Sequence, residues 1–258
     1  IQSTNANAFQ INVSGSKNST ATIDYSGTLD ALNGNALNYS ASVSTGGTAT
    51  ADITFQEGSL VTASGTSDLL GVPTAGGGVV MTDINPLGPN AWTVTNHGTF
   101  LTRNDAISMY STDNGTYVIN SDGTLGTSLN PLGGSGAVIV ASSASADGTV
   151  NNNGGEIWAA GGGGPGGVFG GIAVVVGGNA VVDSVDGDVH TVDGPGVLAS
   201  GGKSATVDTQ DGLVESTNGP GIIAATLGTG NTVVDSGEVN AGSGAFAGLS
   251  LPAGPLTV

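Results

Sequence analysis

Short apolar segments recur along the whole chain, and turns rich in Gly, Asn, Asp or Ser separate them. The recurrence is clearest in the C-terminal third, where residues 194–199 (GPGVLA) return 25 positions later as residues 219–224 (GPGIIA). Over the same shift, residues 186–189 (DGDV) return as residues 211–214 (DGLV), and the next shift of 25 leads to residues 236–239 (SGEV). The chain therefore contains an internal structural repeat.

One motif can be followed through the repeats back into the N-terminal region. It consists of an apolar residue, positions rich in Asn, Asp or Ser, a glycine, one variable residue and a second apolar residue. We predict structural turn glycines at Gly27, Gly58, Gly98, Gly123, Gly155, Gly187, Gly212 and Gly237, at intervals of 31, 40, 25, 32, 32, 25 and 25 residues. A second apolar segment follows each glycine by roughly ten residues, so one repeat holds about three short strands.

A repeat of this size, built of short strands, is too small to bury both of its faces alone. Coiling the chain so that each strand lies on its counterpart in the next repeat solves this problem and produces a solenoid. We therefore predict an all-β fold, a single-stranded right-handed parallel β-helix of about eight coils, because parallel crossovers are almost always right-handed. Equivalent residues then stack about 4.8 Å apart.

The pattern also predicts how the chain is divided. Residues 1–22 lack most of the motif, and Phe9, Ile11 and Val13 alternate with polar residues, which indicates an N-terminal capping strand. Residues 23–251 are predicted to form the β-helix and residues 252–258 a C-terminal tail. The long intervals between glycines predict loop insertions at residues 67–90, 126–136 and 161–171.

The turn residues have a predicted physical role. A sharp turn favours a residue that tolerates positive φ, so we expect this conformation at the motif glycines. The Asn and Asp side chains that precede them are expected to hydrogen-bond along the stack. We interpret Asp183, Asp208 and Asp235 as solvated turn residues, and structural Ca²⁺ between stacked Asp side chains remains an alternative.

Composition narrows the class of protein. The chain has 258 residues, of which 47 are Gly and 9 are Pro, and 3 Lys or Arg stand against 20 Asp or Glu, for a net charge of −17. This balance excludes a helical bundle and a nucleic-acid binder, because phosphate contacts need many more cations. Cysteine is absent, aromatic residues make up 4%, and we expect a core of Val, Ile, Leu and Ala. The longest apolar run, residues 172–176, is too short to span a membrane.

Residues 93–100 (TVTNHGTF) and 232–239 (TVVDSGEV) resemble the "V-x-N-x-G-x-I" coils of bacterial autotransporter passenger domains. The resemblance covers roughly residues 23 to 251, and no membrane barrel follows, so it implies a released or excised passenger. Such domains are secreted right-handed β-helices that act as adhesins, self-associating factors or stalks. The resemblance thus implies an extracellular location on the bacterial outer surface, with a surface receptor, a glycan or copies of itself as partner.

Polysaccharide lyases and hydrolases also use parallel β-helices, and they need carboxylates that converge on one groove. No two Asp residues are adjacent here, and the cations Lys17, Arg103 and Lys203 lie on distant coils. We interpret His97 as a turn residue and His190 as an exposed residue. The sequence therefore predicts no catalytic, cofactor or metal site.

The sequence as a whole predicts an extracellular, non-catalytic adhesin or scaffold that mediates cell-surface or cell–cell contact. Two alternatives stay open. One is a subunit of a self-assembling surface filament or layer, which would pair through the strand of Phe9, Ile11 and Val13. The other is a β-helical polysaccharide lyase or hydrolase.

Overall fold

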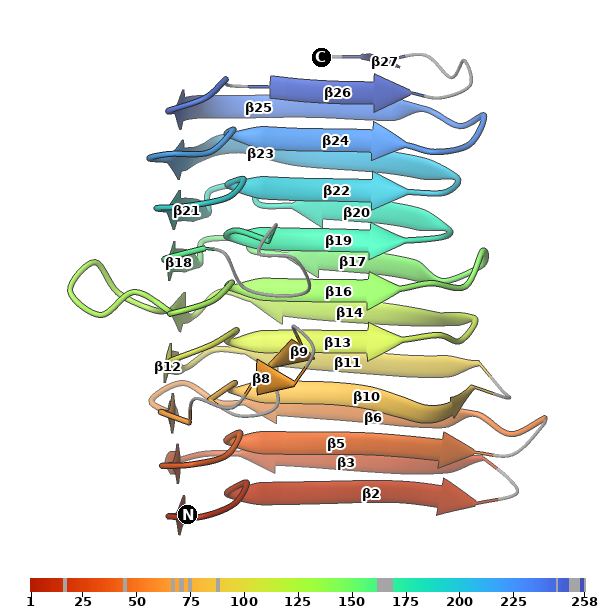
Figure 1. The fold of residues 1–258 in the computed structure, drawn as a ribbon, viewed down its shortest axis with the longest axis vertical. Coiled ribbons are helices and arrows are strands. Elements are labelled where there is room, and N and C mark those ends of the chain that lie inside the picture. The colour runs from red at the N-terminus through yellow and green to blue at the C-terminus, as the bar shows by residue number, and fades with distance from the viewer. Residues whose placement is uncertain are drawn as a thin grey trace.

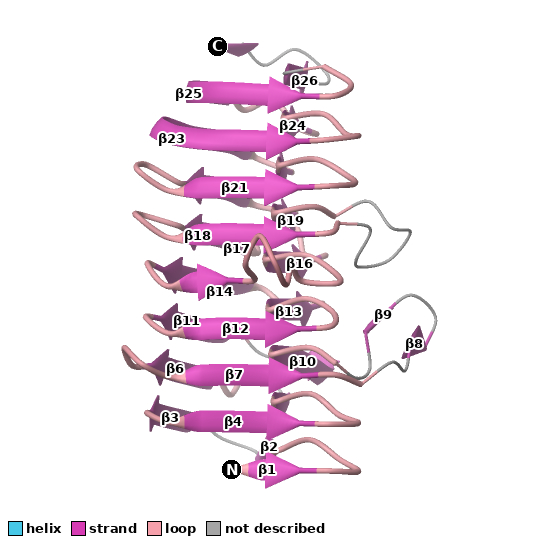
Figure 2. Cartoon of the chain, turned by 90° about the vertical axis from the view of Figure 1, so that its left-hand side faces the viewer, coloured by secondary structure: helices cyan, strands magenta, loops and turns pink. Residues whose placement is uncertain are grey.

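The chain winds upward as a parallel β-helix in a computed structural model that describes residues 1–15, 18–43, 46–65, 68–69, 72–73, 76–86, 89–161, 169–244, 246–250 and 256–257 (Figure 1). Each turn runs along the front of the rod in Figure 1, returns along the back and crosses the left-hand side, which faces the viewer in Figure 2. This sense of winding is right-handed. The described residues contain no helix, and hence none of the length and hydrophobicity needed to cross a membrane.

Three ladders of strands, all paired in parallel, form the walls of the rod. The front ladder contains β2 (Phe9–Gly15), β5 (Leu37–Val43), β10 (Val79–Pro86), β13 (Ile107–Ser111), β16 (Ala137–Ala141), β19 (Ile172–Val176), β22 (Val197–Gly201), β24 (Ile222–Thr226) and β26 (Phe246–Ser250). The back ladder contains β3 (Ser19–Tyr25), β6 (Ala49–Phe55), β11 (Asn90–Asn96), β14 (Gly115–Ser121), β17 (Asp147–Asn151), β20 (Asn179–Asp183), the first halves of β23 (Ser204–Ser216) and β25 (Thr232–Ala241), and β27 (Leu256–Thr257). The side ladder contains β1 (Gln2–Ser3), β4 (Thr28–Ala31), β7 (Leu60–Ala63), β12 (Thr99–Thr102), β15 (Thr124–Leu125), β18 (Glu156–Ala159), β21 (Asp188–Thr191) and the second halves of β23 and β25.

The predicted all-β parallel β-helix is confirmed, and the described residues make nine turns instead of about eight. The additional turn is the first, which consists of β1, β2 and β3 and has no motif glycine. The alternating segment β2 is the terminal rung of the front ladder and pairs in parallel register with β5. The boundary predicted at residue 22 falls inside β3, because this segment is a regular coil as well as the end of the rod.

The predicted insertions differ in their outcome. Within residues 67–90, β8 (Asp68–Leu69) and β9 (Val72–Pro73) form an antiparallel pair, but Val79–Pro86 is the strand β10 of the front ladder, since Val79 and Met81 fill the core. Within residues 126–136, a loop between β15 and β16 stands out from the rod (Figure 1). Residues 162–168 of the third insertion lie outside the described residues. The predicted tail at 252–258 contains β27, which pairs with β25.

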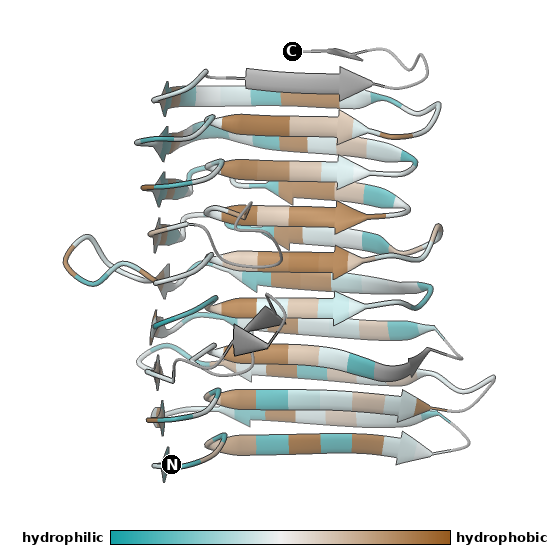
Figure 3. Cartoon of the chain, in the orientation of Figure 1, coloured by the Kyte–Doolittle hydropathy of each residue, from teal (hydrophilic) through white to brown (hydrophobic). Residues whose placement is uncertain are grey.

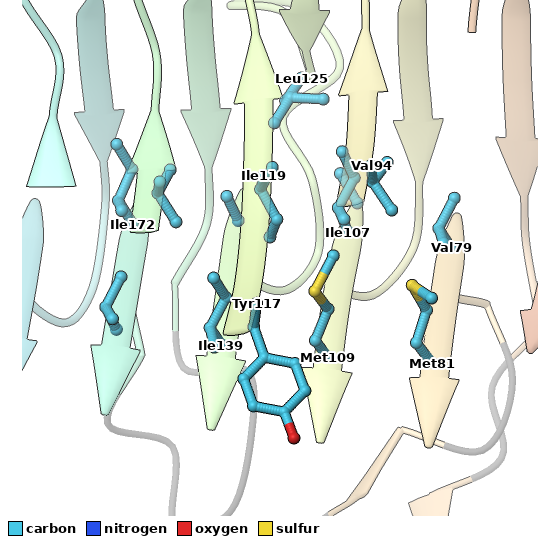
Figure 4. Close-up of a cluster of buried hydrophobic side chains, with 14 of the residues drawn as sticks. Val79, Met81, Val94, Ile107, Met109, Tyr117, Ile119, Leu125, Ile139 and Ile172 are labelled. Carbon is cyan, nitrogen blue, oxygen red and sulfur yellow. The ribbon is translucent and has the colours of Figure 1, made fainter. Parts of the chain in front are cut away.

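The core is a column of stacked side chains inside the rod (Figure 4). The expected Val, Ile, Leu and Ala fill the C-terminal coils, but in the N-terminal half five aromatic residues lie inside the rod: Tyr39, Phe55, Trp92, Phe100 and Tyr117. Trp92 packs edge-to-face on Tyr39 and Tyr117, with ring centroids 5.6 and 5.3 Å apart, and Phe55 packs on Phe100 at 5.1 Å. Edge-to-face packing is favourable because the positive edge of one ring meets the negative face of the other, and these rings are fully buried.

The motif glycines lie along the corner where the back ladder turns into the side ladder. Strand pairing places Gly27, Gly98, Gly123, Gly155, Gly187, Gly212 and Gly237 immediately before equivalent residues of the side ladder. Ser59 takes this place in the remaining coil, and Gly58 is displaced by one residue. Positive φ occurs at Gly27 (112°) and Gly58 (79°) alone among the eight, so the expectation of positive φ was wrong for the other six.

Those six glycines are required by close approach to the preceding coil. A Cβ atom at Gly212 would lie 2.4 Å from the carbonyl oxygen of Gly187, and one at Gly123 would lie 2.3 Å from that of Gly98. The positive φ falls one residue earlier in several coils, at Gly154 (75°), Asp186 (58°) and Asp211 (58°). Asp tolerates this conformation better than most residues, which explains its place before the glycine.

Candidate functional site

The two histidines of the chain each pair with a carboxylate one coil further along. The Nδ1 atom of His97 lies 2.6 Å from Oδ1 of Asp122, and Nδ1 of His190 lies 2.8 Å from Oε2 of Glu215. Both pairs are separated by 25 residues, which is the shortest repeat interval. Our sequence analysis missed both carboxylates, although adding one repeat to each histidine would have found them.

The His97 pair lies on the outside of the glycine corner, between two polar hollows. One hollow of about 220 Å³ is lined by Thr95, His97, Asn120, Ser121, Asp122, Asn151 and Asn153, and the other, of about 410 Å³, by Gln56, Glu57, His97 and Asp122. The Asp122 carboxylate orients the imidazole of His97 through Nδ1, so Nε2 is the ring nitrogen that does not contact the carboxylate. The pair is solvated, with 38% of the His97 side chain and 54% of the Asp122 side chain exposed.

The cations named in the sequence analysis do not join this pair. Arg103 follows β12 whereas His97 precedes it, so the two residues lie roughly 20 Å apart along the strand direction. Lys203 lies several coils away, between β22 and β23, and Lys17 is outside the described residues. Among the described residues, the structure therefore keeps His97, Arg103 and Lys203 apart.

The second histidine belongs to an aromatic stack on the side ladder. The rings of Trp158 on β18 and His190 on β21 are 3.7 Å apart and nearly parallel, at 8°. The indole Nε1 of Trp158 donates to Oε1 of Glu156 at 2.6 Å. A cavity of about 140 Å³ adjoins the stack and is lined by Ser128, Pro131, Trp158, Ala159, His190, Thr191, Val192, Glu215 and Thr217. Sequence analysis did not single out Trp158, because its stacking partner His190 comes from the next coil.

The front ladder has a different chemical character from the other two. Its strands from β13 to β26 contain no charged residue and no histidine, and Figure 3 shows β16 and β19 mainly in brown and the first parts of β22 and β24 in brown. In β10 the front ladder carries one acidic residue, Asp83, next to a register shift. Partly buried apolar residues on the outer side of these strands, among them Tyr110, Val140, Val175 and Leu198, pack in one cluster.

The stacked polar residues of the back corner behave partly as expected. Buried Asn96 donates to Ser121 at 3.1 Å, and buried Asn152 donates to Ser184 at 3.0 Å, so hydrogen bonds along the ladder are confirmed. Asp183, Asp208 and Asp235 stack in register on the outer side of the back ladder. The described residues contain no group of three or more His, Asp or Glu that could hold a metal ion.

A buried carboxyl occupies the corner between the side and front ladders. Asp105 is fully buried, and its Oδ1 accepts the backbone N–H of Ser135 at 2.8 Å while its Oδ2 accepts the hydroxyl of Tyr110 at 3.2 Å. Burial raises the pKa of Asp105, although these hydrogen bonds oppose the effect. Burial also raises the pKa of Tyr110, and the nearby Asp105 adds to this shift.

No family model, no curated protein and no solved structure matches the chain. The assignment of function consequently depends on the geometry and charge of the described residues.

Proposed function

We propose that this chain is a non-catalytic scaffold or adhesin of the bacterial surface that makes cell–cell contact by self-association through its front ladder. The observation that carries the proposal is the uncharged outer side of β13 to β24 in a chain of net charge −17. The likeness of residues 93–100 and 232–239 to autotransporter passenger coils supports an extracellular location.

The distribution of charge favours one face over the others. Acidic residues lie on the back ladder, for example Asp147 and Asp208, and on the side ladder, for example Glu156 and Asp188. Two copies that approach through these faces repel each other, and burying unpaired carboxylates would cost several kcal/mol. The front ladder is the face through which two copies can approach without that cost.

The front ladder offers a small face for contact. Strands of five residues are about 17 Å wide, and the five rungs from β13 to β24 span about 24 Å, so they outline roughly 400 Å². The outward side chains of Ser108, Val138 and Ala173 are already fully buried, so the free surface is smaller than this outline. Two copies would bury at most about 800 Å², less than a stable specific interface. We therefore expect a weak and reversible contact, which becomes effective when many copies are displayed together.

The test compares two identical substitutions within one coil. Val175 on β19 faces outward from the front ladder, and Val181 on β20 faces outward from the back ladder, and both are partly buried. We expect Val175→Asp to abolish concentration-dependent self-association in sedimentation experiments at 0.15 M salt, and Val181→Asp to leave it unchanged. A parent protein that stays monomeric at every concentration, or equal behaviour of the two variants, would contradict the proposal.

The two alternatives from the sequence have different signatures. A filament subunit that pairs through Phe9–Gly15 would lose assembly when the first coil is removed, and would keep it in Val175→Asp. A lyase or hydrolase would release sugar from a polysaccharide and would lose this activity in His97→Ala or Arg103→Ala.

A further inference from the structure

The loop between β15 and β16 ends in a closed turn that exposes a leucine. The loop stands out from the rod in Figure 1, and residues 126–136 (GTSLNPLGGSG) include no charged residue. Two backbone hydrogen bonds between Thr127 and Asn130, of 3.0 and 3.1 Å, close the turn at Ser128 and Leu129. Leu129 is 89% exposed, more than any other large apolar residue that the structure describes. A preorganised turn of this kind loses little conformational entropy when it binds.

Both ends of the loop are held on the rod. At one end, Gly126 donates its backbone N–H to the carbonyl oxygen of Phe100 at 2.8 Å. At the other end, fully buried Leu132 donates to the carbonyl oxygen of Trp158 at 2.8 Å, and Pro131 lies in register with Trp158. The loop therefore holds its tip away from the rod in a defined position.

A mainly apolar hollow lies toward the opposite edge of the same coils. It measures about 380 Å³ and is lined by Thr82, Asp83, Tyr110, Ser111, Thr112, Val140 and Ser142. Tyr110 and Val140 are outward residues of β13 and β16 and belong to the apolar cluster of the front ladder. The hydroxyl of Tyr110 donates to buried Asp105 at 3.2 Å, so its ring presents a fixed apolar surface.

The carboxylate in the lining of the hollow already has donors from its own chain. Oδ2 of Asp83 accepts the hydroxyl of Ser111 and, at 2.9 Å, the backbone N–H of Thr112. Oδ1 of Asp83 accepts the hydroxyl of Thr112 at 3.3 Å. A carboxylate with these internal donors depends less on water than an isolated one, so an apolar group can enter the hollow at a lower cost.

The front ladder needs an anchor of this kind. Its face alone would bury at most about 800 Å² in a contact of two copies, and stable interfaces are larger. Interfaces depend on a few side chains that fill pockets in the partner. The hollow is continuous with the front ladder, because Val140 pairs in register with Val175. The uncharged tip can approach it without adding to the repulsion between chains of net charge −17.

The tip and the hollow lie at the same height of the rod. The loop connects β15 to β16, and the hollow lies toward the carboxyl ends of β10, β13 and β16, on the other side of the rod in Figure 1. A second copy that is shifted sideways without tilt therefore brings one tip to the hollow of its neighbour. We infer that Leu129 of one copy binds in the hollow beside Tyr110 and Val140 of the next copy.

This contact joins two different surfaces and is therefore heterologous. It leaves a free hollow at one end of the assembly and a free tip at the other, so copies add in rows of parallel rods. The inference rests on the proposed self-association through the front ladder and names the segment of the second copy that this face binds.

The first experiment removes the tip. Leu129→Asp and Leu32→Asp each add one negative charge between the side and front ladders, at residues that are 89% and 53% exposed. We expect Leu129→Asp to weaken concentration-dependent self-association at 0.15 M salt by about tenfold or more in sedimentation experiments. Leu32→Asp should associate like the parent. Circular dichroism should be unchanged in both variants, because both side chains are exposed.

The second experiment mixes two variants that lack different surfaces. Ser142→Arg places a long charged side chain at the hollow and keeps the tip, whereas Leu129→Asp keeps the hollow and loses the tip. At concentrations where the parent associates, each variant alone should stay monomeric. Their mixture should form one-to-one pairs that grow no further, because only one tip and one hollow remain. Ser243→Arg, at an exposed serine after β25, is the control and should associate like the parent.

The outcomes separate this inference from the proposed function. Self-association that is lost in Val175→Asp but kept in Leu129→Asp would retain the front ladder as the interface and overturn the inference. A mixture of Ser142→Arg and Leu129→Asp that stays monomeric would also overturn it. Loss of association in Leu129→Asp, together with pairing in the mixture, would support it.

Discussion

Single residues in this protein are constrained by the residue one coil away. Asn35 and Asp105 hold the same corner position in different coils, and each accepts a backbone N–H from the next coil with its Oδ1 atom. An amide performs this role without charge, whereas the carboxyl of Asp105 is fully buried and has a raised pKa because of that burial. The ionised form of Asp105 is thus disfavoured in the folded state.

The raised pKa of Asp105 predicts a pH-dependent stability. Its contribution is fully present below the pKa of the unfolded chain and is lost as the pH rises through the raised folded pKa. Each tenfold difference in proton affinity between the two states is worth about 1.4 kcal/mol. We expect Asp105→Asn, which keeps the acceptor for Ser135, to gain stability relative to the parent as the pH rises from about 4 to 7. Urea denaturation of both proteins across this range measures the difference, and a constant difference would contradict the prediction.

Among the elements, the glycine corner follows the sequence repeat, whereas the aromatic stack does not follow it throughout. The corner follows the repeat, so its residues share one environment in coil after coil. The stack of Tyr39, Trp92 and Tyr117 connects residues 53 and 25 positions apart, because Tyr39 lies on β5 of the front ladder, Trp92 lies on β11 of the back ladder one coil later, and an insertion lies between them. Among the described residues, the buried hydroxyl of Tyr39 and the buried indole N–H of Trp92 have no hydrogen-bond partner.

The corner predicts opposite effects of two neighbouring substitutions. Gly212→Ala should lower the free energy of unfolding by about 1–3 kcal/mol, because overpacking has this cost and the new Cβ would lie 2.4 Å from the carbonyl oxygen of Gly187. Asp211→Gly should raise it by up to about 1 kcal/mol, because it relieves a left-handed conformation at φ 58°. Chemical denaturation measures both. A loss of stability in Asp211→Gly would show that the Asp side chain contributes more than its backbone strain costs.

The whole molecule separates charge from apolar surface. The core is continuous along the rod, the acidic residues lie mainly on two ladders and at turns, and the third ladder is uncharged from β13 onward. Long-range repulsion between copies therefore opposes a short-range attraction that is confined to one face. Such a balance responds to the ionic conditions of the medium.

Self-association is therefore expected to increase with salt and with acidification toward the isoelectric point of about 4.1. The Debye length falls from about 30 Å at 0.01 M to about 8 Å at 0.15 M ionic strength, so repulsion between copies is screened in ordinary media. Light scattering of the parent and of Val175→Asp across salt and pH measures the effect. Assembly that weakens as salt rises would refute the role assigned to charge.

The sequence by itself determined the repeat, the parallel coiling and the corner that most of the motif glycines occupy. It could do so because equivalent residues of successive coils lie about 4.8 Å apart in the same environment, so the chain must satisfy the same constraint at a regular interval. The same reasoning would have placed His97 beside Asp122 and His190 beside Glu215, since both pairs are one repeat of 25 residues apart.

Tertiary structure alone decided features that depend on irregular intervals. The first coil has no motif glycine and could not be found from the repeat; its strands are held by pairing with β4, β5 and β6. The cavity beside Trp158 requires the loop between β15 and β16 of the preceding coil. The position of this loop follows from its packing over the ladder and not from the local sequence. The glycines are needed for contact between coils more than for positive φ, and this distance between backbones exists only after the coils have stacked.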